Sequence, residues 1–137
     1  MAAAVNARRL TRILYYPYGV GEMGDTLGPF EQLVLAAILA LEDDAYGVTI
    51  HATVEKLSGR RKITRGAVYA TLDRMEDKGL IASWLSEPTQ ERGGRSRRYY
   101  RLEKSGRQAL KESAQAARRL YETVASNLGG IAWKTPR

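Results

Sequence analysis

Apolar side chains recur at helical spacing in residues 64–80, whose sequence is TRGAVYATLDRMEDKGL. Three of them lie four and three positions apart, on one side of a helix: Val68, Leu72 and Met75. Thr64 can accept a hydrogen bond from the first unpaired backbone amides, and Gly79 supplies the left-handed residue that ends many helices. The pattern therefore predicts an amphipathic helix with one buried side.

The opposite side of this predicted helix carries small and hydrogen-bonding residues: Arg65, Gly66, Tyr69, Ala70 and Asp73. Arg65, Tyr69 and Asp73 are stacked at positions i, i+4 and i+8. An exposed helix of this kind fits the major groove of B-DNA, where its first turn can reach base edges. An ordinary surface helix, with Arg65 and Tyr69 simply solvated, stays open as an alternative on this pattern alone.

Two more helices are predicted upstream. Gly28-Pro29 marks a turn and a first helical position, and the following stretch, PFEQLVLAAILALEDD, is apolar almost all round. Such a helix is expected to be buried from several sides. A second helix is expected from about Tyr46 to Ser58, with apolar positions that are only partly helical in period: Val48, Ile50, Val54 and Leu57.

After Gly79 the pattern changes to that of strands. Two short β-rich runs, residues 80–85 and 97–102, flank a polar loop that contains Gly93-Gly94, and they predict a hairpin. Its tip and the start of its return strand hold Arg92, Arg95, Arg97 and Arg98. Arginines on a β-loop can reach phosphates or a minor groove. The alternative, protection of a sheet edge from aggregation, is disfavoured because the charge has one sign and follows the predicted amphipathic helix.

A last helix is predicted from about Lys104 to Leu128. Six side chains on it are separated by 4, 3, 4, 3 and 4 positions, the spacing of a coiled-coil seam: Leu110, Ala114, Ala117, Tyr121, Val124 and Leu128. A helix extending alone past a small domain would leave this seam in water. We therefore expect a symmetric homodimer, in which the seam packs on its own copy or on the partner's first helix. A helix folded back on its own domain is the alternative.

Three helices, a two-stranded wing and a long helix follow one another in the order of a dimeric winged helix-turn-helix protein. The expected fold class is mostly α (α+β). Residues 27–103 are expected to form the winged helix domain, residues 104–128 the dimerisation helix and residues 129–137 a tail. Residues 1–26 are expected to be an arm, either disordered or, if translation starts at Met23, largely upstream of the true start.

Positive charge is concentrated in one short stretch. The 137 residues have a net charge of +7, and residues 92–107 alone hold seven basic side chains and one acidic one. Such a patch is typical of a nucleic-acid-binding protein, because each basic side chain displaces a condensed counterion. The triplet Arg60, Arg61 and Lys62 adds charge just before the predicted amphipathic helix, although any solvated loop could hold it.

Other classes of protein find little support. The chain has no cysteine, no apolar run long enough to span a membrane and no secretory signal, so a cytoplasmic protein is expected. Its one histidine, His51, has Glu55 at i+4, but no third metal ligand, nucleophile elbow or phosphate-binding glycine motif accompanies the pair. We expect no enzyme activity, metal or cofactor, and a structural or surface role for His51.

Several segments carry a family resemblance. GAVYATLDRMEDKGLI followed by GGRSRRYYRLEKSGRQAL, together with LGPFEQLVLAAIL and the AYG of residues 45–47, resembles the PadR-like transcriptional regulators over roughly residues 27–125. The resemblance implies a cytoplasmic, bacterial-type repressor that dimerises through its C-terminal helix and binds a palindromic operator in double-stranded DNA. The single C-terminal helix is similar to the family's short subgroup, which lacks a second, effector-sensing helical domain.

The resemblance also implies roles for individual residues. Tyr69 matches the tyrosine of the family's recognition helix and Gly66 the small residue that lets this helix approach DNA, whereas Ala70 stands where many members have proline. Glu103 stands where a Thr or Ser usually precedes the last helix, and it makes a poorer cap. The basic wing of the family is matched by Arg95, Arg97 and Arg98.

The complete set of expected DNA contacts is Arg60, Arg61, Lys62, Thr64, Arg65, Gly66, Tyr69, Arg92, Arg95, Arg97 and Arg98. The main alternative is a winged-helix module that binds a protein instead of DNA. Such a module should have an apolar or acidic helix face and no arginine cluster. A small-molecule effector is the least defined expectation: Trp84, Tyr46 and the first helix could line an apolar pocket at the dimer interface, and structural packing explains these residues equally well.

Overall fold

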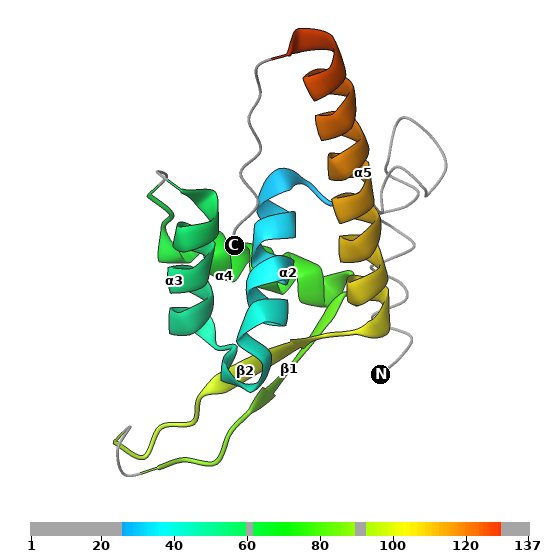
Figure 1. Ribbon diagram of the computed structural model, residues 1–137. Helices are drawn as coiled ribbons and strands as arrows, with labels where there is room; N and C mark the ends of the chain where they lie inside the picture. The colour runs from blue at the N-terminus through cyan, green and yellow to red at the C-terminus, as the bar shows by residue number, and fades with distance from the viewer. Residues whose placement is uncertain (1–25, 60–61, 90–92, 130–137) are drawn as a thin grey trace.

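The structure is a computed structural model that describes residues 26–59, 62–89 and 93–129 (Figure 1). Its elements follow the chain in the order α2 (Pro29–Leu41), the 3₁₀ turn η1 (Glu42–Asp44), α3 (Gly47–Ser58), α4 (Arg65–Asp77), β1 (Ile81–Leu85), β2 (Arg98–Leu102) and α5 (Lys104–Leu128). This order confirms the predicted, mostly helical winged helix-turn-helix fold. Arg60, Arg61, Arg92 and most of the expected arm and tail lie outside the described residues.

Helices α2, α3 and α4 pack around one apolar core, and the hairpin of β1 and β2 extends from its edge (Figure 1). The largest fully buried side chains come from all three helices: Val34, Leu35, Ile50, Val54, Val68, Thr71, Leu72 and Met75. Each fully buried aliphatic side chain stabilises the fold by about 1.5–3 kcal/mol relative to an exposed one. The core therefore holds the three helices in a fixed arrangement.

The upstream helices are less completely buried than their composition predicts. On α2, Leu39 is 45% exposed, so this helix is not buried all round. On α3, Val48 and Leu57 are both exposed, and Ile50 and Val54 form the buried side. Val48 is about 200° round the helix from Ile50, and Leu57 lies in the last turn, beyond the core.

Helix α4 has the limits and the buried side that were predicted. The Thr64 hydroxyl accepts a hydrogen bond from the Ala67 backbone N–H at 3.1 Å, so Thr64 is the N-cap. After the helix ends at Asp77, Gly79 has φ 76°. The apolar stripe is fully buried, and the neighbouring Thr71 is buried as well. The core therefore holds α4 by one side along most of its length.

The wing is an antiparallel pair in which Ile81 pairs with Leu102 and Leu85 with Arg98. Each strand begins one residue later than predicted. The sequence did not predict that a third segment pairs with the wing. Tyr46 forms an isolated antiparallel bridge with Tyr99, and the Tyr100 N–H donates to the Ala45 carbonyl at 2.9 Å. The wing is thereby attached to the residues that precede α3.

Helix α5 starts against the turn between α4 and β1. The Glu103 N–H donates to the Leu80 carbonyl at 2.9 Å, and the Ser105 hydroxyl donates to the Gly79 carbonyl at 2.7 Å. As expected, the Glu103 side chain makes no capping hydrogen bond. The first turns of α5 pack beside α2, and the helix continues past the domain (Figure 1). None of the described helices is long and apolar enough to cross a membrane.

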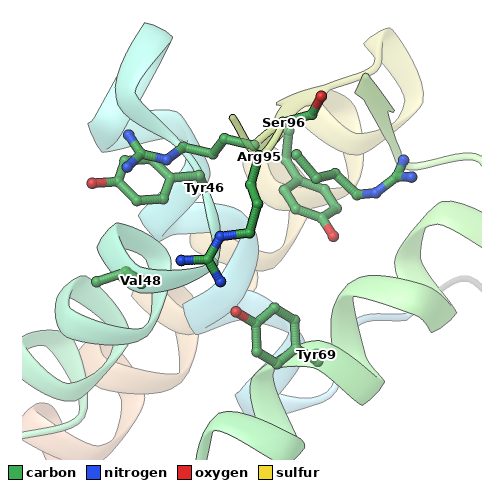
Figure 2. A pocket seen from close by; sticks show the side chains of 9 residues that line it. Tyr46, Val48, Tyr69, Arg95 and Ser96 are labelled. Carbon is green, nitrogen blue, oxygen red and sulfur yellow. The ribbon is translucent and has the colours of Figure 1, made fainter. Parts of the chain in front are cut away.

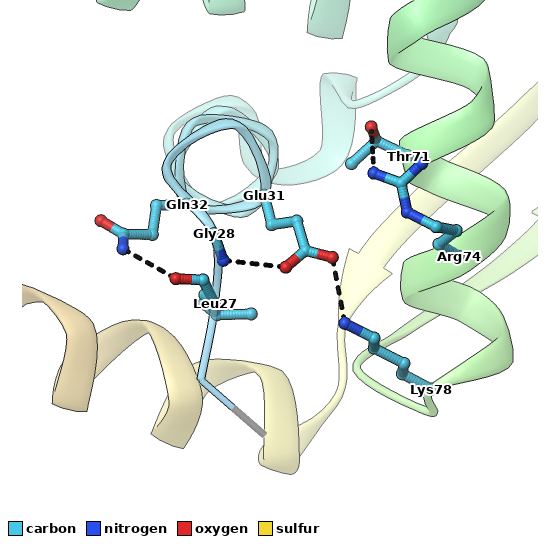
Figure 3. A network of polar contacts seen from close by, with 7 residues as sticks. All are labelled: Leu27, Gly28, Glu31, Gln32, Thr71, Arg74 and Lys78. Atoms are coloured by element: carbon cyan, nitrogen blue, oxygen red, sulfur yellow. Dashed lines mark hydrogen bonds and ion pairs between the residues drawn. The ribbon is translucent and has the colours of Figure 1, made fainter. Parts of the chain in front are cut away.

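A polar network joins the start of α2 to the end of α4 (Figure 3). The Glu31 carboxylate accepts hydrogen bonds from the Gly28 N–H at 2.9 Å and from the Lys78 ammonium at 3.0 Å. Desolvation alone would raise the pKa of Glu31, but these two partners, together with the positive charge of Arg74, lower it overall. The pair therefore stabilises the position of α4 as long as Glu31 is ionised.

Candidate nucleic-acid interface

The side of α4 away from the core is open to solvent. All the residues predicted on it are exposed: Arg65, Gly66, Tyr69, Ala70 and Asp73. A Cβ atom placed on Gly66 would have nothing within 4 Å, so the protein itself does not require glycine at this position. The first turn of α4 is therefore a smooth surface with Arg65 at its N-terminal end.

Next to this surface lies an open groove of about 760 Å³ between the first turn of α3, helix α4 and the wing (Figure 2). Its lining brings together three segments that are distant in the sequence: Tyr46, Gly47, Val48, Tyr69, Arg95, Ser96, Arg97, Arg98 and Tyr100. In Figure 2, the Arg95 and Tyr69 side chains both point into the groove. The structure thus places the predicted helix tyrosine and the predicted wing arginines at one site.

An aromatic stack forms the base of the wing. The Tyr99 ring contacts Tyr46 edge-on, with centroids 5.6 Å apart, and is stacked on Trp84, with centroids 6.0 Å apart. The Arg97 guanidinium lies 3.9 Å from the centroid of the Tyr46 ring, a cation–π distance. Tyr46 and Trp84, the two residues suggested for an effector pocket, thus both pack against Tyr99 of the wing.

The three described wing arginines have different surroundings. Arg97 Nη1 donates to the Tyr99 hydroxyl at 3.5 Å, and this bond raises the pKa of Arg97, which stays charged. Arg98 Nη1 donates to the Ser83 hydroxyl at 2.8 Å, and this hydroxyl donates in turn to the Glu76 carboxylate at 2.6 Å. Arg98 is thus connected to α4 by a hydrogen-bonded chain, and all three arginines line the groove.

The loop before α4 carries the remaining expected contacts that the structure describes. Lys62 and Thr64 are exposed there, and Thr64 also caps α4. His51 Nε2 donates to the Ile63 carbonyl at 2.6 Å, and its Nδ1 lies 3.6 Å from the Glu55 carboxylate. His51 therefore holds this loop against α3, which is the structural role expected of it.

The sequence did not indicate several residues of the groove, among them Gly47 and Tyr100. Gly47 lines the groove beside Tyr69. In the sequence it stands out only as part of the AYG segment, which carries the family resemblance. Tyr100 is 6% exposed, and burial raises the pKa of its hydroxyl, which therefore stays protonated at neutral pH. Strand alternation around β2 could have indicated that Tyr100 faces inwards, since Leu102 does so too.

The residues of the predicted dimer seam lie along α5. Leu110 packs partly on the core of its own domain, near the start of the helix. Further along, Ala114 and Ala117 are exposed, Tyr121 and Val124 are half-buried, and Leu128 is 77% exposed. Most of the apolar seam therefore lies beyond the core of this domain.

One known family matches the sequence. The profile of the transcriptional regulator PadR-like family matches residues 34–112, which is more than half of the 137 residues. No curated protein matches the chain.

Solved structures of PadR proteins share this fold. A PadR family transcription regulator from hypervirulent Clostridium difficile is 29% identical, with a TM-score of 0.62 over 74% of this chain and 100% of that one. A PadR-like transcriptional regulator from Bacillus cereus is 28% identical, with a TM-score of 0.60 over 74% of this chain and 92% of that one. The chain belongs to the PadR-like family of transcriptional regulators.

Proposed function

We propose that this regulator is a sequence-specific DNA-binding repressor that acts as a homodimer on a palindromic operator. One observation carries the proposal: the solvent-exposed side of α4 adjoins a groove lined by wing arginines. An exposed helix beside a basic hairpin can read base edges and hold the backbone at the same time. The winged-helix protein-binding alternative requires an apolar or acidic helix face, which α4 does not have.

In the proposed complex, α4 lies in the major groove. Its first turn carries Arg65, whose guanidinium can donate two hydrogen bonds to a guanine. Gly66 adds no bulk between the helix and the DNA, and Tyr69 is 44% exposed one turn further on. These three residues would supply the sequence preference.

The wing is proposed to hold the DNA backbone or an adjacent minor groove. Arg95, Arg97 and Arg98 come from the stretch with a net charge of +6, and they line the side of the groove nearest to the wing. Contacts between arginines and phosphates add affinity without adding sequence preference, and they make binding depend steeply on salt. Lys62 and Thr64 would add backbone contacts at the start of α4.

The homodimer is proposed to form through α5. The apolar seam of this helix extends past the domain, and its last residue, Leu128, is 77% exposed. Burying such a seam against its own copy gives a two-fold axis. The two α4 helices would then have to lie about 34 Å apart to enter successive major grooves on one side of the DNA.

Selection from a random-sequence DNA pool, followed by mobility shifts at several salt concentrations, tests this proposal. The wild-type protein should enrich a palindrome, and its affinity for that duplex should fall steeply with salt. Arg65→Ala and Tyr69→Ala should reduce the preference over random duplex. Arg95→Ala should weaken binding to all sequences about equally and lower the salt slope by about 1. Enrichment of no duplex would refute the proposed function.

The matched control for these variants is Arg119→Ala. This change also removes one positive charge, and Arg119 is exposed on α5, on the side of the helix away from the seam, and does not line the groove. Its affinity and salt slope should equal those of the wild type. Sedimentation at the protein concentration of the binding assay tests the dimer, and a single-subunit species there would refute it.

A further inference from the structure

Gly47, the first residue of α3, leaves room for a side chain of α4. A Cβ atom on Gly47 would overlap the Tyr69 hydroxyl and would lie 2.8 Å from both Cε1 and Cζ of the Tyr69 ring. Non-bonded carbon atoms are usually separated by about 3.5–4.0 Å. The Tyr69 ring therefore occupies the space that any larger residue at position 47 would fill.

Backbone geometry does not explain this glycine. Gly47 has helical backbone and is not one of the residues with positive φ, so an alanine could adopt the same conformation. Alanine is also the better helix former. The property of Gly47 that matters here is its lack of a side chain, because the Tyr69 ring occupies the space that a side chain would fill.

The backbone on either side of Gly47 is fixed by hydrogen bonds. The Tyr46 N–H donates to the Thr49 hydroxyl at 3.0 Å, and the Ile50 N–H donates to the Tyr46 carbonyl at 2.8 Å. The preceding residues are bound to β2 through the Tyr46 bridge. Tyr69, in contrast, is 44% exposed and contacts Gly47 with the far end of its side chain. If the two overlapped, the ring would move and α3 would stay in place.

We propose that Gly47 is a positioning residue for DNA recognition: it admits the Tyr69 ring to the groove between α3 and the wing, and so sets the direction in which Tyr69 meets DNA. This inference rests on the proposed function, in which Tyr69 contacts the operator. An alanine at position 47 would turn the ring out of the groove and towards a less favourable rotamer. The protein would stay folded, but its sequence preference would change.

A double-mutant cycle tests the proposal. Wild type, Gly47→Ala, Tyr69→Ala and the double variant are each titrated against the duplex that the wild type enriches and against a random duplex. Gly47→Ala should weaken binding to the enriched duplex by about three- to tenfold, the cost of an off-rotamer side chain, and should leave random-duplex binding unchanged. In the Tyr69→Ala background the same change should have no further effect. Ala52→Ser, a small change on the exposed side of α3, is the control.

Three outcomes would overturn the proposal. Gly47→Ala could bind both duplexes as the wild type does, or could weaken binding equally with and without Tyr69. It could also lower the melting temperature. If the melting temperature falls equally in the Tyr69→Ala background, the fold of α3 itself requires the glycine. If the wild type enriches no duplex at all, the proposed function fails too, and this result is distinct from the other three.

Discussion

The same substitution, glycine to alanine, should have opposite effects on stability at two positions in the first turns of α4 and α5. Gly66 has open space around its Cβ position. At Gly106 a Cβ atom would overlap the Leu80 carbonyl oxygen and lie 3.0 Å from its carbon. Because both residues are helical, the change in helix propensity is common to the two sites. The difference between the two changes in the free energy of unfolding therefore measures the close approach of α5 to Leu80.

The size of the effect follows from these contacts. Alanine favours a helix over glycine by about 0.5–1 kcal/mol, and at Gly66 nothing opposes this gain. At Gly106 the added methyl meets backbone that cannot rotate away, and overpacking of this kind costs about 1–3 kcal/mol. Moving α5 aside would also weaken the Glu103 and Ser105 hydrogen bonds to Leu80 and Gly79, at about 1 kcal/mol. Gly106→Ala should thus destabilise the protein by about 1–3 kcal/mol net.

Urea unfolding at 25 °C, followed by circular dichroism, measures both changes. Protein concentration must be held constant, because the stability of a dimer depends on it. We expect a higher midpoint for Gly66→Ala, a lower one for Gly106→Ala and equal slopes. If Gly106→Ala were as stable as the wild type, the close approach of α5 to Leu80 would be refuted.

Three more changes have defined outcomes. Thr64→Ala removes the cap of α4 and should lower the free energy of unfolding by about 1 kcal/mol; an unchanged urea midpoint would argue against the cap. Desolvation raises the pKa of Glu31, but its bonds to Gly28 and Lys78 and nearby positive charge lower this pKa overall. These interactions therefore stabilise the folded protein above pH 4.5, the ordinary pKa of glutamate, and this stabilisation is lost as the pH falls below that value. Glu31→Gln should therefore flatten the acid side of a stability profile, and parallel profiles would contradict this. His51→Ala removes the hydrogen bond to Ile63 and should speed hydrogen exchange in residues 62–66. Unaltered exchange would show that the conformation of this loop does not depend on His51.

Helix α4 is the element that sequence alone predicts best. Its cap at Thr64, its buried stripe and its stop at Gly79 all lie within seventeen consecutive residues, and each has a local physical cause. The hairpin and α5 are also predicted, because alternation, glycines and seam spacing are local patterns. Period is less informative for α3, where Val48 and Leu57 look like core positions but are exposed.

The shape of the groove depends on contacts that no local pattern encodes. Tyr46 pairs with Tyr99, more than fifty positions away, and Gly47 meets Tyr69 across two helices. Periodicity can place Tyr69 on the exposed side of α4, but it cannot say which backbone its ring rests on. For this reason the wing arginines and the helix tyrosine were predicted as separate features, whereas the structure joins them in one groove.

The junction between α4 and α5 connects the two halves of the proposed function. Three residues separate the last residue of α4 from the start of β1, and two carbonyls in this short turn, those of Gly79 and Leu80, accept hydrogen bonds from the first turn of α5. Gly106 lets the helix sit directly against the second of them. In a dimer held by α5, the distance between the two α4 helices would then be set by this rigid contact and not by a flexible linker. Operator spacing should accordingly be strict: inserting one base pair between the half-sites should weaken binding far more than replacing a central base pair.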